Sequence, residues 1–349
     1  MSQTPRLFIA PAGAGKTAYA VNRARRHAAD PNTPCHVLVA SALQARAFRR
    51  RLADSGGALG VHILTFEELY RRSLHPTQLH LTEISDAVQH RVIRSVLRKI
   101  PLEHYAPVRE RPGFVRCLKS VVDELKAGRI HPDAFSRAVD RHSGEPRLRD
   151  LAAIYAAYQA RLQRESWSDR AGLGWLAVEA IEQGDVQSVV DITLLIVDGF
   201  DDFTIVQLDA LAALATRVDQ MVITLSGDLS KAPRALAHRR FSRTRDALIE
   251  RLHVEPEPLP GSRTRKADVL ERLEAGLYQA GPYQAGPFES DAPSVADGDI
   301  VEFLEAPSRA DEARAALRWA KRTIVQDGIE PDDVILLVRD LDVYRPFIT

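Results

Sequence analysis

The chain has 349 residues, enough for two domains or for one domain with a large insertion. Hydrophobic residues make up 45% of it, which supports a sizeable core, and Lys plus Arg equal Asp plus Glu at 47 each. This balance excludes a global basic field, so a surface for nucleic acid has to be local. Two arginine clusters are candidates, although a solvated helix face explains each of them equally well. They are Arg46, Arg49, Arg50 and Arg51, and Arg239, Arg240, Arg243 and Arg245.

Cysteine usage and apolar run lengths place the chain in a reducing compartment without a membrane partner. Cys35 and Cys117 stand far apart in the sequence, so neither a disulfide framework nor a zinc site follows. No run approaches the roughly 18 apolar residues of a membrane span, and the N-terminus has no signal-peptide pattern. We therefore expect a cytoplasmic protein. Residues 342–349 carry no helix stop or polar tail, so we also expect the chain to be a fragment of a longer one.

The first 80 residues alternate between strand and helix patterns. Residues 7–9 form an apolar strand candidate, and a helical pattern runs from Ala18. A second strand at 36–40 precedes a helix at 41–52 with Phe48 among its apolar positions. A third strand at 61–64 leads into Thr65, a candidate N-cap with two glutamates in the following turn. This alternation predicts a parallel sheet.

A small-residue loop between the first strand and the first helix has the pattern of a phosphate-binding loop. Gly13 and Gly15 lack a Cβ, so backbone N–H groups can close around an anion. Lys16 is placed to reach the outer phosphates, and the Thr17 hydroxyl to ligate Mg²⁺. The first glycine of GxxxxGK[ST] is replaced by Ala10, which an alanine at negative φ allows. The candidate nucleotide-binding residues of the loop are Ala12, Gly13, Ala14, Gly15, Lys16 and Thr17.

From Thr82 to about Gln183 the patterns are helical, with almost no strand signal. One helix opens at Thr82–Ser85, the next spans 113–126, and a third covers 148–162. About a hundred residues of helix inside an α/β frame predict a helical insertion.

The sheet pattern resumes at 192–197 and again at 220–225, with a helix at 207–215 between them. Residues 231–266 are arginine-rich and interrupted by prolines, and the tandem Tyr-Gln-Ala-Gly-Pro at 278–287 indicates a loop or linker. A further strand, helix and strand follow. They are predicted at 300–304, 310–324 and 334–338 and indicate the first unit of a second α/β domain.

Asp198 follows the apolar strand, where a carboxylate facing the loop would hold Mg²⁺. A general base for hydrolysis would normally come next, but that residue is Gly199. Asp201 and Asp202 follow on a turn, and Asp198 and Asp202 are the candidate catalytic carboxylates. The sequence therefore predicts nucleotide and Mg²⁺ binding with weakened or lost hydrolysis; loss of a general base typically costs about 10²–10⁴ in rate.

The order of motifs resembles that of the superfamily 1 helicases of the UvrD/Rep type over nearly the whole chain. Besides the loop, the motifs are Ser41-Ala-Leu43, Leu64-Thr-Phe-Glu67, Asp198-Gly-Phe-Asp-Asp202 and Ser226-Gly-Asp228. The Asp-Gly-Phe-x-x-Phe form at 198–203, Gly113-Phe114 and the 151–162 helix are most similar to the N-terminal part of the B subunit of AddAB/RexAB-type helicase–nucleases. Active relatives have Glu where Gly199 stands and Gln where Lys231 stands, and Gln3 lies too close to the first strand to read adenine.

The resemblance implies a RecA-like P-loop domain at 1–80 and 186–230, interrupted by a helical insertion at 81–185. A connecting segment at 231–295 would lead to the start of a second RecA-like domain at 296–349. ATP and Mg²⁺ are the implied cofactors. Ser41, Thr65 and Phe66 are the implied DNA contacts, and the arginines of the insertion are further candidates. An N-cap role for Thr65 and a core role for Phe66 explain these residues equally well.

The resemblance also implies double-strand-break repair in a heterodimer with an active helicase–nuclease subunit. A nuclease module with an iron–sulfur cluster would lie outside these residues. Two alternatives stay open. One is an active UvrD-like or AdnA-like helicase with Asp201 or Asp202 as base; the other is a non-hydrolysing scaffold that recognises a DNA sequence.

Overall fold

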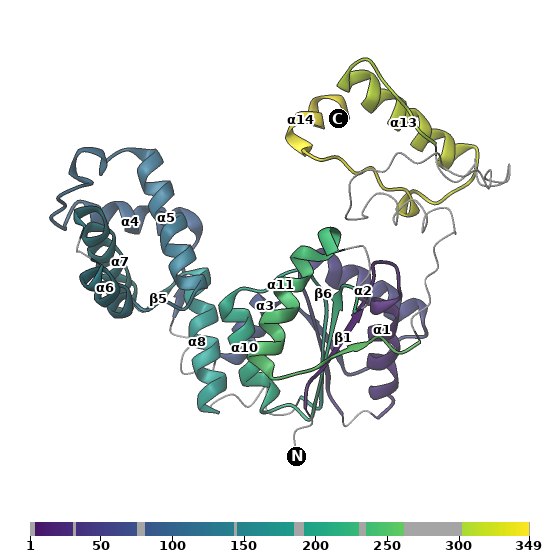
Figure 1. Cartoon of the computed structure of the whole chain (residues 1–349), viewed down its shortest axis with the longest axis horizontal. Helices are drawn as coiled ribbons and strands as arrows, with labels where there is room; N and C mark the ends of the chain where they lie inside the picture. Colours follow the sequence, from purple (N-terminus) through teal and green to yellow (C-terminus); the bar gives the residue numbers. More distant parts are fainter. Residues whose placement is uncertain are drawn as a thin grey trace. The chain divides into compact units, whose positions relative to one another are not determined.

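The computed structural model describes residues 4–30, 33–74, 81–142, 145–184, 192–229, 235–261 and 302–348 (Figure 1). The chain divides into two compact units, Met1–Ala280 and Gly281–Thr349. Lys231 and the tandem repeat at 278–287 lie outside the described residues.

The first unit alternates strand and helix, then continues through a series of helices before the strands resume. Its strands are β1 (Arg6–Ala10), β2 (Cys35–Val39), β3 (Val61–Leu64), β4 (Thr82–Glu83), β5 (Trp167–Ser168), β6 (Leu194–Phe200), β7 (Gln220–Ser226) and β8 (Pro256–Pro258). Its helices are α1 (Lys16–His27), α2 (Ala42–Asp54), α3 (Phe66–Ser73), α4 (Asp86–Leu97), η2 (Ala106–Val108), α5 (Pro112–Ala127), α6 (Pro132–Arg141), α7 (Pro146–Arg164), α8 (Arg170–Gln183), α10 (Ile205–Ala215) and α11 (Ala235–Leu252).

Within the described residues the main sheet has six strands in the order β3-β2-β6-β7-β1-β8, and every pairing in it is parallel. The carboxyl ends of all these strands therefore meet at one edge, which we call the carboxyl edge. β7 pairs with both β1 and β6, so the loop after β1 and the acidic end of β6 lie two strand spacings apart, about 10 Å. This topology brings together two motifs that are almost 200 residues apart in sequence.

Helices cover both faces of the sheet, α1 and α2 on one side and α3, α10 and α11 on the other (Figure 1). Along β1, Leu7 and Ile9 enter the apolar cluster of the second face, while Phe8 and Ala10 enter that of the first. A strand buried on both faces needs apolar residues at every position, which explains the unbroken run in β6.

The strands predicted for the sheet are confirmed: β2, β3, β6 and β7 form where the sequence indicates strands. The arginine-rich segment at 231–266, which the sequence indicates as a connector, contains α11 and the strand β8. Prolines weaken a strand signal because they donate no ladder hydrogen bond. Here Pro256 and Pro258 are tolerated because β8 is the edge strand and pairs with β1 alone.

Helices α4, α5 and α7 share a core of their own, which includes Val92, Leu118, Tyr155 and Tyr158. The predicted helix start at Thr82 is wrong: Thr82–Glu83 is the short strand β4 paired with β5, and α4 begins at Asp86. Helix α8, predicted as part of the insertion, packs on α3 and α10, and its apolar residues join the cluster of the sheet. Two cores thus meet along α8.

A buried ion pair joins the helical insertion to α8. The Lys126 ammonium of α5 lies 2.6 Å from the Asp169 carboxylate, and both side chains are almost fully buried. The same carboxylate accepts the Tyr158 hydroxyl at 2.6 Å and the backbone N–H of Gly172 at 2.7 Å, so it also caps α8. Burial lowers the pKa of Lys126, and the charge of Asp169 opposes that shift. Both oxygens of the Asp169 carboxylate thus accept hydrogen bonds, which stabilises its buried charge.

The second unit contains α13 (Arg309–Val325), η4 (Pro331–Asp333) and α14 (Leu341–Ile348). The predicted helix at 310–324 is confirmed, but the strand predictions are wrong for the described residues 302–304 and 334–338, which are irregular. Their apolar side chains are exposed, among them Phe303 and Leu337. A strand forms only beside a neighbour that pairs with its backbone, and the described part of this unit offers none.

Across the described ranges, no helix has both the length and the apolar character that crossing a bilayer requires. Both cysteines are free, and burial raises the pKa of the Cys35 thiol to about 12.

Candidate phosphate-binding loop and adjoining groove

The loop after β1 turns through two glycines in the left-handed region, Gly13 at φ 77° and Gly15 at φ 88°. Gly15 is the N-cap of α1, and no side chain caps this helix. The first-turn N–H groups of α1 therefore remain available to an external acceptor. A Cβ added at Gly15 would meet nothing within 4 Å, so the space above the loop is open. The predicted strand, loop and helix start are all present here.

Lys16 folds back over this loop. Its ammonium donates to the carbonyls of Ala10 at 3.1 Å and Pro11 at 2.8 Å. Burial lowers the pKa of Lys16, and the negative charges of Asp198 and Asp201 oppose that shift. The lysine thus lies within electrostatic reach of both carboxylates. Thr17 is half-buried in the first turn of the same helix.

Asp198 ends the buried part of β6 at the carboxyl edge and is only 3% exposed. Its carboxylate accepts the Thr224 hydroxyl from β7, the strand between β1 and β6. Thr224 is buried as well, so this bond holds one carboxylate oxygen in a defined orientation. Within the described residues the second oxygen has no hydrogen-bond partner, and an oxygen ligand of this kind suits Mg²⁺.

A bulge follows immediately. The register between β6 and β7 shifts between Val197 and Phe200, and Gly199 takes φ 80°. The Gln44 side chain of α2 donates to the Gly199 carbonyl at 3.0 Å and accepts the Ala40 N–H at 2.9 Å. A Cβ at position 199 would meet the Gln44 amide group at 3.2–3.3 Å. The residue that replaces the expected glutamate is thus held in a conformation and a space that suit glycine.

The two aspartates of the following turn have different surroundings. Asp201 lies 3.4 Å from Arg240 of α11 and acts on the pKa of Lys16. Asp202 accepts the backbone N–H of its neighbour Phe203 at 2.8 Å. The structure therefore brings Asp198 and Asp201 toward the loop, whereas no described contact joins Asp202 to it.

A groove of about 780 Å³ lies between the carboxyl edge and the helical insertion. The turns after β2 and β3, the start of α10, and helices α4, α5 and α8 all contribute to its lining. The three residues predicted to contact DNA, Ser41, Thr65 and Phe66, all line this groove.

Each of these three residues also has a structural role. The Ser41 hydroxyl caps α2 by accepting the Gln44 N–H at 3.2 Å. Thr65 forms a capping box with Glu68 at the start of α3, in agreement with the predicted N-cap. Phe66 is 5% exposed, and its ring contacts Phe200 and Phe203 edge-on.

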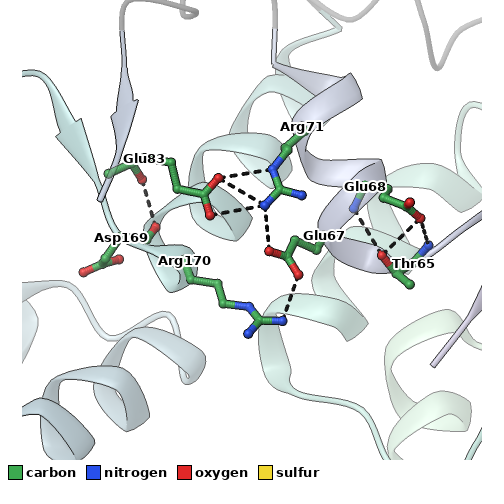
Figure 2. A network of polar contacts seen from close by, with 8 residues as sticks. Thr65, Glu67, Glu68, Arg71, Glu83, Asp169 and Arg170 are labelled. Atoms are coloured by element: carbon green, nitrogen blue, oxygen red, sulfur yellow. Dashed lines mark hydrogen bonds and ion pairs between the residues drawn. The ribbon is translucent and has the colours of Figure 1, made fainter. Parts of the chain in front are cut away.

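Acidic residues outnumber basic ones by one along the groove. Four acidic residues line it, Glu67, Glu68, Asp86 and Asp123, against three basic ones, Arg71, Lys119 and Arg170. All three bases are paired. Figure 2 shows Arg71 between Glu67 and Glu83, and Arg170 against Glu67. Lys119 bridges Asp86 and Asp123 at 3.4 and 2.8 Å. The groove therefore offers no surplus positive charge.

Sequence reasoning missed Gln44 and Thr224, which hold the acidic strand end in place. Their partners lie 155 and 26 residues away in the sequence, and only the strand order brings them together. A buried polar residue in the middle of the apolar strand 220–226 was the one available signal for Thr224.

The arrangement defines an α/β protein with a parallel six-stranded sheet and a helical insertion, and with glycine turns and a buried aspartate at one sheet edge. Residues 7–254 match the family described as "ADDB, N-terminal", and the chain belongs to that family.

Two similar relatives are named as the B-type subunit of an ATP-dependent helicase/deoxyribonuclease. That of Moorella thermoacetica is 27% identical over 98% of this chain and 31% of its own length. That of Symbiobacterium thermophilum is 27% identical over 97% of this chain and 30% of its own length. The chain thus spans about a third of these relatives. The predicted relationship to the N-terminal part of this kind of protein is confirmed.

Proposed function

We propose that this chain binds Mg²⁺ and ATP at the carboxyl edge and single-stranded DNA in the adjoining groove. It would do so as the motor-like part of a B-type helicase–nuclease subunit in double-strand-break repair, with weakened or absent hydrolysis. The relatives' names, which combine ATP dependence with helicase and deoxyribonuclease activity, support this role. An active helicase–nuclease subunit would be the partner.

One observation carries the nucleotide part of the proposal: Lys16, on an open glycine-turned loop, lies within electrostatic reach of the buried Asp198. In a RecA-like P-loop domain the uncapped N–H groups of α1 would receive phosphate oxygens. Lys16 would exchange its two carbonyl partners for the outer phosphates. Thr17 and Asp198 are the residues that would hold Mg²⁺, which would neutralise phosphate charge.

Two features support weakened hydrolysis. Position 199 has no side chain, and the Gln44 amide occupies the space into which one would project. Water attack on the terminal phosphate therefore lacks the carboxylate that would normally orient it. Asp198 itself is engaged by Thr224 and is buried, which suits a metal ligand better than a proton acceptor.

A second candidate function is an active ATP-dependent helicase with Asp201 as the base. Its support is specific, because the charge of Asp201 acts on Lys16. Asp202 has no comparable observation in its favour. The ion pair of Asp201 with Arg240 of α11 weighs against this role, because it engages the carboxylate that would have to accept the proton.

Measuring DNA-stimulated ATP turnover distinguishes the chain with weakened or absent hydrolysis from the active helicase. We expect nucleotide binding by the wild type, loss of that binding in Lys16→Ala, and little or no turnover with or without oligo(dT). Robust DNA-stimulated turnover that disappears in Asp201→Ala but persists in Asp202→Ala would establish the active helicase instead.

The second unit is proposed to begin a further α/β domain. Its support is the apolar pattern of residues 302–304 and 334–338 on either side of α13, with exposed side chains at Phe303, Ile335 and Leu337.

A further inference from the structure

A second cavity, of about 540 Å³, lies between the turn after β6 and the first half of α11. We call it the arginine pocket. It is lined by Asp202, Arg239, Arg240, Arg243 and Thr244. Among the described residues, the pocket is therefore lined by three arginines and one carboxylate.

Two contacts hold α11 against the turn and so shape this pocket. The buried Thr244 hydroxyl donates to the Asp201 carbonyl at 2.8 Å, and Arg240 pairs with the Asp201 carboxylate at 3.4 Å. The Asp202 carboxylate is partly satisfied by the Phe203 N–H. Arg239 and Arg243 lie one helical turn apart, are exposed, and form no ion pair within the described residues. The pocket therefore keeps a positive surplus.

The arginine pocket adjoins the groove along the chain. Asp202 lines the pocket and Thr204 lines the groove. Two residues span at most about 7 Å, which equals the rise of about two base steps along a nucleic-acid strand. The two hollows therefore border the same turn, and a strand of a few nucleotides is long enough to reach from one to the other.

The two hollows differ in the chemistry that they offer. Four acidic side chains and three already paired basic ones line the groove, so a phosphate placed there would meet net negative charge. The backbone N–H of Thr65 is also engaged, by Glu68 at 2.7 Å. Guanidinium groups, by contrast, are well suited to phosphate because of their planar array of donors.

We propose that the arginine pocket binds the backbone phosphates of the single strand whose bases and sugars enter the groove. Arg239 and Arg243 supply the contacts, and Arg240, held by Asp201, borders them. This inference rests on the proposed DNA-binding function and adds to it the place where the backbone charge is neutralised. The other source of phosphate near this edge is ATP itself, since Asp201 acts on both Arg240 and Lys16.

The test measures oligo(dT) binding across a salt series for the wild type and for Arg239→Ala/Arg243→Ala. Each phosphate contact on a single strand contributes about 0.7 to the slope of log K against log salt, so the double variant should lose about 1.4 of that slope. Its affinity at low salt should fall about tenfold or more. Arg239→Lys/Arg243→Lys keeps the charge and should retain most of the slope.

The matched control is Arg314→Ala/Arg318→Ala, which removes two exposed arginines of the same spacing from α13 and should leave the slope unchanged. Mg²⁺·ATP affinity should be equal in all variants. An unchanged slope in a folded double variant that still binds oligo(dT) would overturn the inference while leaving the proposed function standing. A loss of ATP affinity without a change in oligo(dT) binding would assign the pocket to the nucleotide. A wild type that binds ATP but no oligo(dT) would remove the DNA part of the proposed function and this inference together.

Discussion

The phosphate loop and the groove lie at the same sheet edge but differ in whether their basic groups are already paired with acidic ones. At the loop, the N–H groups at the start of α1 have no side-chain cap, and a lysine is held by two carbonyls that carry no net charge. Along the groove, each of the three lining bases already has an acidic partner. Proximity to an arginine or lysine therefore does not by itself make a phosphate-binding site. What counts is whether its charge is still available, and by that measure the loop and the arginine pocket qualify and the groove does not.

The buried pair of Lys126 and Asp169 stands next in sequence to Ala127 and Arg170, which line the groove, and breaking that pair should have the largest effect. Asp169→Ala leaves the Lys126 ammonium buried without compensation, which typically costs about 3–5 kcal/mol. Urea unfolding measures the loss. Glu165→Ala, which removes an exposed partner of Arg161, is the control and should change stability by about 0.5 kcal/mol or less. A loss below about 1 kcal/mol in Asp169→Ala would mean that the pair does not support the groove.

A buried histidine, His36 near the amino end of β2, gives a second test of stability. Burial, with the nearby His62 and Arg72, lowers the pKa of His36 to about 4 from 6.5. The unfolded state therefore binds the proton more readily between these values, so this stability contribution is complete above pH 6.5 and is lost as pH falls toward 4. The full difference is about 3 kcal/mol.

Urea unfolding of His36→Gln and the wild type from pH 7 to pH 4 isolates this contribution. The gap between the two proteins should shift in favour of the variant as pH falls. A gap that stays constant with pH would show that His36 titrates normally.

Near the phosphate loop, a substitution at Gly199 tests whether the missing general base can be restored. Gly199→Glu should be destabilised by about 1–3 kcal/mol, because φ 80° strains any residue with a Cβ. It should gain no ATP turnover, since the Gln44 amide lies 3.2–3.3 Å from the new Cβ. Gly199→Ala carries the same backbone strain without a carboxylate and is the matched control. Turnover that appears in the glutamate variant alone would show that only the side chain was missing.

The smallest effect concerns Thr65, where a capping role and a DNA role compete. Thr65→Ala should lose about 1 kcal/mol of stability, the usual cost of removing an N-cap, and Thr65→Ser should keep it. We expect oligo(dT) affinity to change by less than about twofold in both. A clear loss of DNA affinity at unchanged stability would instead make the hydroxyl a DNA contact.

Elements that depend on local pattern could be predicted from the sequence. The glycine turns, the Thr65 cap and the apolar strands of the sheet are all visible as short motifs. Features that depend on long-range pairing could not. The prolines of β8 mask its strand pattern in the sequence. The contacts of Gln44 with Gly199 and of Thr224 with Asp198 follow only from the strand order.

The strand predictions in the second unit fail for a related reason. An apolar run such as 334–338 is compatible with a strand, but periodicity does not say whether a pairing partner is present. At the groove, Ser41, Thr65 and Phe66 do line a hollow, as a DNA contact would require. No local pattern, however, indicates that the bases beside them are all paired by Glu67, Glu83, Asp86 and Asp123.

The proposed function depends most on whether the loop after β1 binds a triphosphate. The measurement is equilibrium titration of Mg²⁺·ATP into the wild type, Lys16→Ala and Lys99→Ala, the last removing an exposed lysine that follows the C-cap of α4. We expect saturable binding by the wild type and by Lys99→Ala. Affinity should be at least about tenfold weaker in Lys16→Ala, because a charged hydrogen-bond partner of phosphate contributes about 1.5–3 kcal/mol. Equal affinity in the wild type and Lys16→Ala, or no binding by a folded wild type, would contradict the account.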